Sequence, residues 1–301
     1  MTVDSAALAA ALDEPEDALL APEMRSFALG HGARTERVTV LVHGLTASPR
    51  TWLAFARERH ARGESVLAPR LPRHGHADRA TNALAYLTEA ELREQGRRIV
   101  DAAALLGEHI TVVGHSMGGA LTLHLAHRDA RIERAIAIAP FLGIRRLPHD
   151  WHTWTRRLLQ RAPNRFLWWD PIDRGRSLPP HGYPRYSTRS IVAGLALADA
   201  LRTDARSGPP VARHVEILRN ASEMSVNNRT IDDLVARWRA AGGSSVRVHR
   251  VTGLARSHDI VEPERPRAEA LRFLPALHGL LDAPPPDRDV TLDLSAPTIV
   301  Q

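Results

Sequence analysis

A serine flanked by glycines lies in the stretch VVGHSMGGAL, residues 112–121, directly after a run of β-branched residues. Gly114 and Gly118 suit a buried strand that ends in a tight turn before a helix, because backbones crowd together there. Ser116 lies at the top of that turn, where its hydroxyl would be exposed as a nucleophile. The alternative is that Ser116 is only a small turn residue, so the remaining chemistry must be sought elsewhere in the chain.

A serine nucleophile needs a base within hydrogen-bond reach, a carboxylate that orients the base, and N–H donors for the developing oxyanion. We expect the base beyond the last strand, where the stretch LARSHDIVEP places His258 seven residues after Val251. Two other late histidines, His249 and His278, fall inside a predicted strand and a predicted helix. His258 is therefore the candidate base, although a lone histidine on a loop is often only a polar surface residue.

The orienting acid is expected on the turn that follows the strand predicted over residues 214–220. The stretch ILRNASEMSVNN offers Glu223 there, before the next helix. Glutamate fills this role in Ser-His-Glu variants of the arrangement. Asp204 and Asp259 are the alternatives, and neither lies on the expected turn, so Glu223 is the candidate acid.

Two backbone N–H groups are candidates for binding an oxyanion. The stretch VLVHGLTASP follows the first strong strand, and its turn at His43 lets the N–H of Leu45 point into the site. The second donor would be the N–H of Met117, which directly follows the serine. The alternative is that His43 belongs to an ordinary turn without a catalytic role.

No metal or other cofactor is expected. The stretch LPRHGHADR, residues 71–79, follows the next strand and is predicted to shape the rim of the site. Its His74 and His76 have no matching carboxylate cluster, so they are interpreted as structural residues. The chain has no cysteine, which excludes disulfides, thiolate metal sites and a cysteine nucleophile.

Short apolar runs rich in β-branched residues alternate with helical stretches along the chain. This pattern predicts an α/β fold with a mainly parallel, doubly wound sheet and helices on both faces. The predicted strands cover residues 37–42, 64–69, 110–114, 134–140, 214–220 and 246–251. In such a sheet catalytic groups gather at the carboxyl ends of the strands, and every candidate follows a predicted strand.

The strand rhythm breaks over residues 141–213, which contain four of the six tryptophans and many prolines. We interpret this segment as a helical cap insertion between two parts of the core, residues 1–140 and 214–282. Residues 283–301 are predicted to form a loosely held tail. Trp151 and Trp154 are low-ranked candidates for lining a substrate pocket, the alternative being that they only pack the cap.

The composition argues against nucleic-acid and membrane-spanning roles. The formal net charge is +6, but all 40 basic residues are arginines scattered among 34 acidic residues without a long basic block. The N-terminus lacks the basic start of a signal peptide, and no segment has about 18 uninterrupted apolar residues. We therefore expect a cytoplasmic protein without stable membrane insertion and without a nucleic-acid partner.

The motifs HGLTASP, PRLPRHGH, GHSMGG and SHDIVEP resemble those of the α/β-hydrolases, and are most similar to the carboxylesterase and monoacylglycerol-lipase-like branch. The resemblance covers roughly residues 37–275. It implies an α/β-hydrolase fold with a cap, and a serine hydrolase that needs no cofactor. Members usually carry aspartate at the position of Glu223, and the cap is their most variable part, so the natural substrate does not carry over.

The expected reaction is cleavage of small-molecule carboxylic esters, with short to medium acyl chains or a monoacylglycerol-like structure, through an acyl-enzyme. The fold also supports amidases, thioesterases and small-molecule binding proteins without useful turnover, which are the alternatives. A serine at position 116 argues against the branches that use aspartate there, the epoxide hydrolases and haloalkane dehalogenases.

Overall fold

The computed structural model describes residues 2–13, 19–148, 151–176, 178–243, 245–265 and 269–295. Its centre is an eight-stranded sheet with the strand order β1-β3-β2-β4-β5-β8-β9-β10. The strands of this sheet are β1 (Phe27–Leu29), β2 (Thr35–Val42), β3 (Ser65–Ala68), β4 (Gly107–His115), β5 (Ile132–Ile138), β8 (His214–Asn220), β9 (Val246–Thr252) and β10 (Thr291–Asp293). Two further strands, β6 (Phe166–Trp168) and β7 (Arg185–Ser187), pair with each other in antiparallel orientation.

All neighbouring strands of the large sheet pair in parallel except β1, which is antiparallel to β3. This confirms the predicted fold class. All six predicted strands are present, with ends shifted by at most three residues. The strands β1 and β10 at the two edges were not predicted. Since β10 pairs with β9, residues 291–293 are held more firmly than the predicted loose tail.

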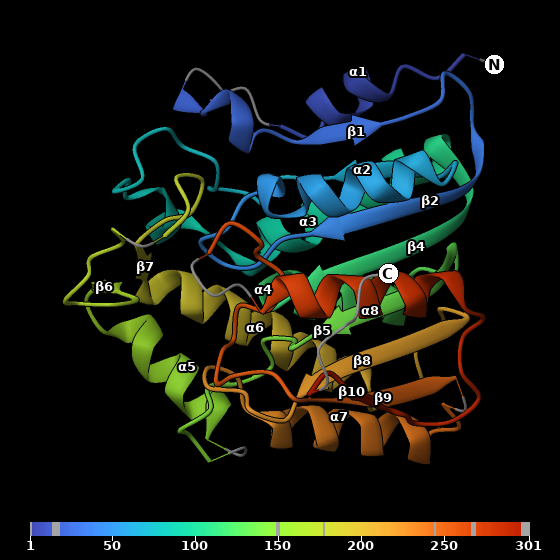
Figure 1. Ribbon diagram of the computed structural model, residues 1–301. Helices are drawn as coiled ribbons and strands as arrows, with labels where there is room; N and C mark the ends of the chain where they lie inside the picture. Colours follow the sequence, from blue (N-terminus) through green and yellow to red (C-terminus); the bar gives the residue numbers. More distant parts are fainter. Residues whose placement is uncertain are drawn as a thin grey trace.

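Helices cover both faces of the sheet. The α-helices are α1 (Ser5–Ala10), α2 (Leu53–Ala61), α3 (Glu89–Leu106), α4 (Met117–Arg128), α5 (His152–Arg161), α6 (Thr188–Asp204), α7 (Asn228–Ala240) and α8 (Ala270–Asp282), with the short 3₁₀ helices η2 (Pro22–Met24), η3 (Pro49–Trp52) and η4 (Ala83–Tyr86). In Figure 1, α2 and α8 lie on the near face of the sheet. No helix in the described ranges combines the length and the apolar character that crossing a membrane requires.

The two faces bury separate hydrophobic clusters. Phe55 of α2 and Phe273 of α8 belong to the cluster on one face, together with Leu41 of β2. Val40 and Val42, the neighbours of Leu41 along the strand, belong to the cluster that contains α3, α4 and α7. This alternation follows from the strand geometry, in which successive side chains point to opposite faces.

The segment interpreted as a cap contains α5, β6, β7 and α6. Figure 1 shows α5 and the β6–β7 pair beyond the carboxyl ends of β2, β4 and β5. The helix α6 joins this segment to the core, because Leu197 and Leu201 are buried in the same cluster as Leu121 of α4. The cap elements therefore lie over the carboxyl ends of the strands.

Arg134, Glu216 and His249 form a buried polar cluster on the neighbouring strands β5, β8 and β9. Arg134 Nε donates to Glu216 Oε1 at 2.6 Å, and the other carboxylate oxygen lies 2.8 Å from His249 Nε2. Arg134 also donates to the carbonyl oxygens of Leu280 and Ala283 at the end of α8. Burial alone would raise the pKa of Glu216, but the hydrogen bonds from His249 and Arg134 lower it below its usual value.

Replacing Arg134 by methionine should strongly destabilise the fold, because it leaves the buried Glu216 carboxylate without its main partner. We expect the free energy of unfolding, measured by urea denaturation, to fall by about 3–5 kcal/mol. Arg131→Met is the control, since Arg131 forms exposed ion pairs with Asp129 and Asp101, and should cost about 1 kcal/mol or less. Equal losses for the two variants would contradict the assigned role of the buried cluster.

Candidate active site

Ser116 lies at the sharp turn between β4 and α4, with φ 55° and ψ −114°. A Cβ atom on Gly114 would lie 2.3 Å from the carbonyl oxygen of Gly118 and from Thr122 Oγ1. A Cβ atom on Gly118 would lie 2.4 Å from the carbonyl oxygen of Val42. Only glycine fits at these two positions, so the glycines let strand, turn and helix pack closely enough to present the serine at the end of β4.

Ser116, His258 and Glu223 lie in one chain of hydrogen bonds across the carboxyl ends of β4, β9 and β8. Ser116 Oγ lies 2.8 Å from His258 Nε2. His258 Nδ1 lies 3.0 Å from each carboxylate oxygen of Glu223. With a proton on Nδ1 donated to the carboxylate, Nε2 is left as an acceptor for the serine hydroxyl. The arrangement can therefore remove a proton from the serine.

The Glu223 carboxylate is held by its own turn. Its Oε1 accepts hydrogen bonds from the backbone N–H groups of Met224, Ser225 and Val226, at 2.8, 2.6 and 3.2 Å. Burial alone would raise the pKa of Glu223, but the hydrogen bond from His258 and those from the backbone lower it below its usual value. The side chain is 1% exposed and ionised at neutral pH.

The two alternative acids form other ion pairs. Asp204 is bound by Arg128 through two hydrogen bonds of 2.8 and 2.5 Å. The Asp259 carboxylate lies 2.7 Å from Arg265. Of the three carboxylates considered from the sequence, Glu223 is the one within hydrogen-bond distance of the His258 ring.

Two side chains hold the loop that carries His258. His115 Nε2 lies 3.0 Å from the carbonyl oxygen of His258, and Asn220 Nδ2 donates to the carbonyl oxygen of Ser257 at 2.8 Å. Burial, with His258 nearby, lowers the pKa of His115 to about 4, so the ring is neutral and donates through Nε2. The sequence analysis did not single out either residue, although His115 lies inside the GHSMGG motif.

Leu45 and Met117 lie beside the serine and line the same cavity. A Cβ atom on Gly44 would lie 3.2 Å from Ser116 Cβ, which shows how closely the loop after β2 approaches the turn. Within the described part of the chain, the N–H groups of Leu45 and Met117 have no hydrogen-bond acceptor. Two backbone donors that the fold does not use are thus available next to the serine.

Two buried histidines hold the loop after β2. His43 Nδ1 lies 2.8 Å from the carbonyl oxygen of Gly44, and its Nε2 accepts the N–H of Leu71. His74 Nε2 accepts the N–H of Thr46 at 3.2 Å. Burial lowers the pKa of His43 well below its ordinary value and that of His74 to about 4. Both rings are neutral and act as structural acceptors, so His43 does more than occupy an ordinary turn.

A cavity of about 600 Å³ opens beside Ser116 and His258. Its apolar lining comes mainly from the cap and the segment leading into it: Phe141, Ile144, Leu159, Leu167, Trp169, Tyr186 and Ile191. The wall also carries polar and charged side chains, among them Thr51, Glu262 and Arg265, and a volume of this size is typical of small-molecule sites. The cavity offers room for an apolar chain next to the serine.

The two cap tryptophans that the sequence offered as candidates for this pocket lie elsewhere, so the alternative, that they do not line it, describes them better. Trp151 and Trp154 do not line the cavity; they are 52% and 59% exposed and pack edge to face at 5.8 Å. Trp151 is the N-cap of α5 and Trp154 lies in its first turn, whereas Leu159, near the end of the helix, lines the cavity. Trp169 and Tyr186 supply the aromatic lining instead, with ring centroids 4.3 Å apart.

A second polar group in the cavity wall was also missed from the sequence. Glu262 accepts a hydrogen bond from Thr51 at 2.9 Å and faces His181 Nε2 of the cap at 3.4 Å. His181 Nδ1 in turn lies 3.2 Å from Ser48 Oγ. Burial raises the pKa of Glu262 to about 7. No motif marked these residues, because a cap residue and two core segments meet only in the folded chain.

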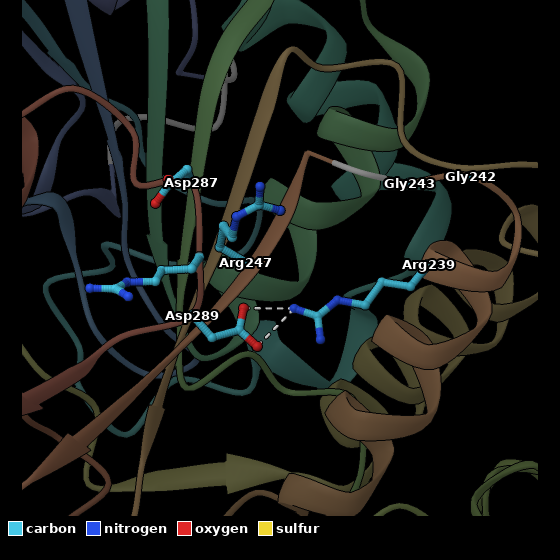
Figure 2. A pocket seen from close by; sticks show the side chains of 7 residues that line it. Arg239, Gly242, Gly243, Arg247, Asp287 and Asp289 are labelled. Carbon is cyan, nitrogen blue, oxygen red and sulfur yellow. Dashed lines mark hydrogen bonds and ion pairs between the residues drawn. The ribbon is translucent and has the colours of Figure 1, made fainter.

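A second cavity, of about 440 Å³, lies near the end of α7. Figure 2 shows Arg239 reaching across it to Asp289, whose two oxygens lie 2.6 and 2.9 Å from the guanidinium. Asp289 also accepts the N–H of Val248. The lining residues that the structure describes are glycine, arginine and aspartate. Asp289 fastens the segment before β10 to α7 and β9.

The comparisons with known proteins agree with this fold. Residues 39–287 match the model of the alpha/beta hydrolase family. A soluble variant of monoglyceride lipase from Saccharomyces cerevisiae is 14% identical, with a TM-score of 0.64 over 86% of this chain and 91% of that chain. The Paleococcus ferrophilus monoacylglycerol lipase is 19% identical, with a TM-score of 0.63 over 86% and 98%.

A structure of the metagenome-derived lipolytic enzymes LipS and LipT is 18% identical, with a TM-score of 0.63 over 88% of this chain and 100% of that chain. At such identities the structural matches show a shared fold. No curated protein sequence matches the chain.

The buried neutral histidines predict a loss of stability in mild acid. Burial lowers the pKa of His74, His115 and His124 from 6.5 to about 4, so the unfolded chain binds more protons between these values. Their contribution is complete above pH 6.5 and is lost as the pH falls toward 4, by about 1.4 kcal/mol per histidine per pH unit. Burial raises the pKa of Glu262 to about 7, so the folded state binds the extra proton there. The contribution of Glu262 to the pH dependence therefore has the opposite sign and cancels that of about one histidine.

Urea unfolding between pH 7 and pH 5 measures this slope. We expect a net decrease of at least about 3 kcal/mol per pH unit near pH 5, because the lowered pKa of His43 adds to the contributions of the three histidines. The decrease should be smaller by about one histidine's contribution in His124→Gln. A free energy of unfolding that stays level, or a slope that His124→Gln leaves unchanged, would contradict the prediction.

Proposed function

Since the chain belongs to the alpha/beta hydrolase family, we propose that it is a serine hydrolase that cleaves carboxylic esters through an acyl-enzyme. The observation that carries this proposal is the hydrogen-bonded chain from Ser116 through His258 to Glu223, at 2.8 and 3.0 Å. The lipases and lipolytic enzymes that share the fold support an ester as the substrate.

In the proposed mechanism Ser116 Oγ attacks the ester carbonyl while His258 Nε2 takes the hydroxyl proton. The ionised Glu223 stabilises the imidazolium that forms and fixes the proton on Nδ1. The N–H groups of Leu45 and Met117 bind the negative oxygen of the tetrahedral intermediate. His258 then gives its proton to the departing alcohol, which leaves the acyl group on the serine. Water activated by His258 releases the acid by the same steps.

The cavity supports a substrate with a short to medium acyl chain or a monoacylglycerol-like ester. Its volume of about 600 Å³ accommodates such a molecule, and the cap supplies an apolar wall that includes Leu159 and Trp169. A thioester or an amide carbonyl would meet the same nucleophile, so matched substrates with one acyl group distinguish these alternatives. A binding protein without turnover would keep the cavity but would not react at Ser116.

Ser116→Ala should abolish hydrolysis of a p-nitrophenyl ester series while leaving the fold intact. The hydroxyl is needed for the chemistry, and removing a nucleophile lowers kcat by a factor of about 10⁴ or more. A fluorophosphonate should label the wild-type protein at Ser116 and should not label the variant. Circular dichroism and thermal unfolding check that the variant is folded. Activity close to wild type in Ser116→Ala would overturn the assignment.

Glu223→Gln should lower kcat by at least about 100-fold, because a neutral amide does not stabilise the imidazolium and favours the wrong histidine tautomer; the comparable change in a serine protease costs about 10⁴. Glu223→Asp should also lose activity. The longer side chain spans from its turn to His258 while three backbone N–H groups hold one oxygen. The control Asp204→Asn should retain most activity.

The outcome against this role is a Glu223→Gln variant nearly as active as wild type together with an inactive Asp259→Asn variant. Steady-state kinetics on one ester at a fixed pH decides between the two carboxylates.

A further inference from the structure

Thr46 adopts a backbone conformation that its side chain disfavours. It follows Leu45 in the segment of residues 44–48 after β2, which we call the oxyanion loop, and its φ is 66°. A positive φ is unfavourable for a β-branched residue and costs about 1–3 kcal/mol. Such a conformation persists only where surrounding contacts hold it, so the contacts of Thr46 decide its role.

Thr46 is held from three directions. Its N–H donates to His74 Nε2 of the core at 3.2 Å. Its carbonyl oxygen accepts the N–H of Tyr183 at 2.7 Å, and its hydroxyl oxygen accepts the indole N–H of Trp169 at 2.8 Å. The last two residues belong to the cap. Two separate points of the cap therefore bind the one strained residue of the oxyanion loop.

The cap segment around Tyr183 has its own attachment to the core. Arg79 donates to the carbonyl oxygens of Gly182 and Pro179, at 2.7 and 3.0 Å. The Tyr183 hydroxyl accepts the N–H of His76 at 2.7 Å. This segment is thus fixed independently of Thr46, and it provides a firm support against which Thr46 is held.

The hydroxyl of Thr46 also reaches the neighbouring peptide. It donates to the carbonyl oxygen of Leu45 at 2.5 Å, while the same oxygen accepts from Trp169. The Leu45 residue is therefore fixed at its carbonyl by a side chain that the cap orients. Its N–H, on the other side of the same residue, is the proposed oxyanion donor.

We propose that Thr46 and Trp169 are positioning residues through which the cap in its present position holds the oxyanion loop in the geometry for catalysis. The inference rests on the proposed serine hydrolase function. Trp169 has two roles, because its ring lines the cavity and its N–H fixes Thr46. Displacement of the cap wall frees the strained turn and turns the Leu45 N–H away from the serine.

Three variants separate these roles. Trp169→Phe keeps an aromatic wall and removes the N–H donor. Thr46→Val keeps the branched shape and removes the hydroxyl, and Thr46→Ser restores the hydroxyl. Trp168→Phe is the matched control, since Trp168 lies next to Trp169 and does not line the cavity. Kinetics on one p-nitrophenyl ester, with thermal unfolding of each variant, gives kcat and KM separately.

We expect kcat to fall by about 10- to 100-fold in Trp169→Phe and in Thr46→Val, since misalignment of an oxyanion donor costs up to about 10²–10³. KM should change by less than about threefold, because the contact acts on the transition state. Thr46→Ser should recover most of the activity. The double variant should be no slower than Thr46→Val, because both changes break the same hydrogen bond.

A kcat that stays at the wild-type value in both Trp169→Phe and Thr46→Val overturns the inference, as does an additive double variant. A change in KM without a change in kcat would show that Trp169 only lines the pocket, and this result would also overturn the inference. These outcomes require an active wild-type protein. Wild-type turnover equal to that of Ser116→Ala would instead show failure of the proposed function, and this inference would fail with it.

Discussion

The left-handed turn at Ser116 is the constraint on which the rest of the structure depends. Its N–H donates to the carbonyl oxygen of Ile138 at 2.9 Å, and its carbonyl oxygen accepts the N–H of Phe141 at 2.9 Å. The end of β5 and the segment leading into the cap thus hold the turn on one side. On the other side Val42 and His43, at the end of β2, approach so closely that only glycine fits at position 118. The strain at the serine is balanced by contacts from distant parts of the chain.

The parallel sheet converts sequence separation into proximity. Ser116 and His258 are 142 residues apart, and Glu223 is 35 residues before the histidine. All three nevertheless lie close together, because each follows a strand whose carboxyl end is on the same side of the sheet. The turn after β8 supplies three N–H groups to Glu223 Oε1. The backbone holds the longer side chain, so its extra rotatable bond does not leave the carboxylate loose.

The sequence was informative where local rules operate. Glycines around Ser116 predicted the turn, and β-branched runs predicted the central strands. Glu223 and His258 were found because they follow two of those strands. The edge strands β1 and β10 were missed because three residues carry too little periodicity to detect. Trp151 and Trp154 could not be told apart from pocket residues, because the position of α5 is set by its contacts with α6, where Asp199 binds Thr153 and Arg156. Thr46 and Glu262 could not be found, since their partners Trp169, Tyr183 and His181 come from a remote insertion.

Two strained residues, Ser116 and Thr46, lie in the neighbouring segments that form the proposed site, and long-range contacts hold each of them. The turn at Ser116 is held by Ile138 at the end of β5 and by Phe141 at the start of the cap segment, whereas Thr46 is held by Trp169 and Tyr183, farther along that segment. The proposed nucleophile and the proposed oxyanion donor are thus held by different parts of the chain. If the proposed roles hold, a shift of Trp169 or Tyr183 acts on the chemistry itself as well as on the shape of the acyl pocket, because catalysis depends on donors held within a fraction of an ångström.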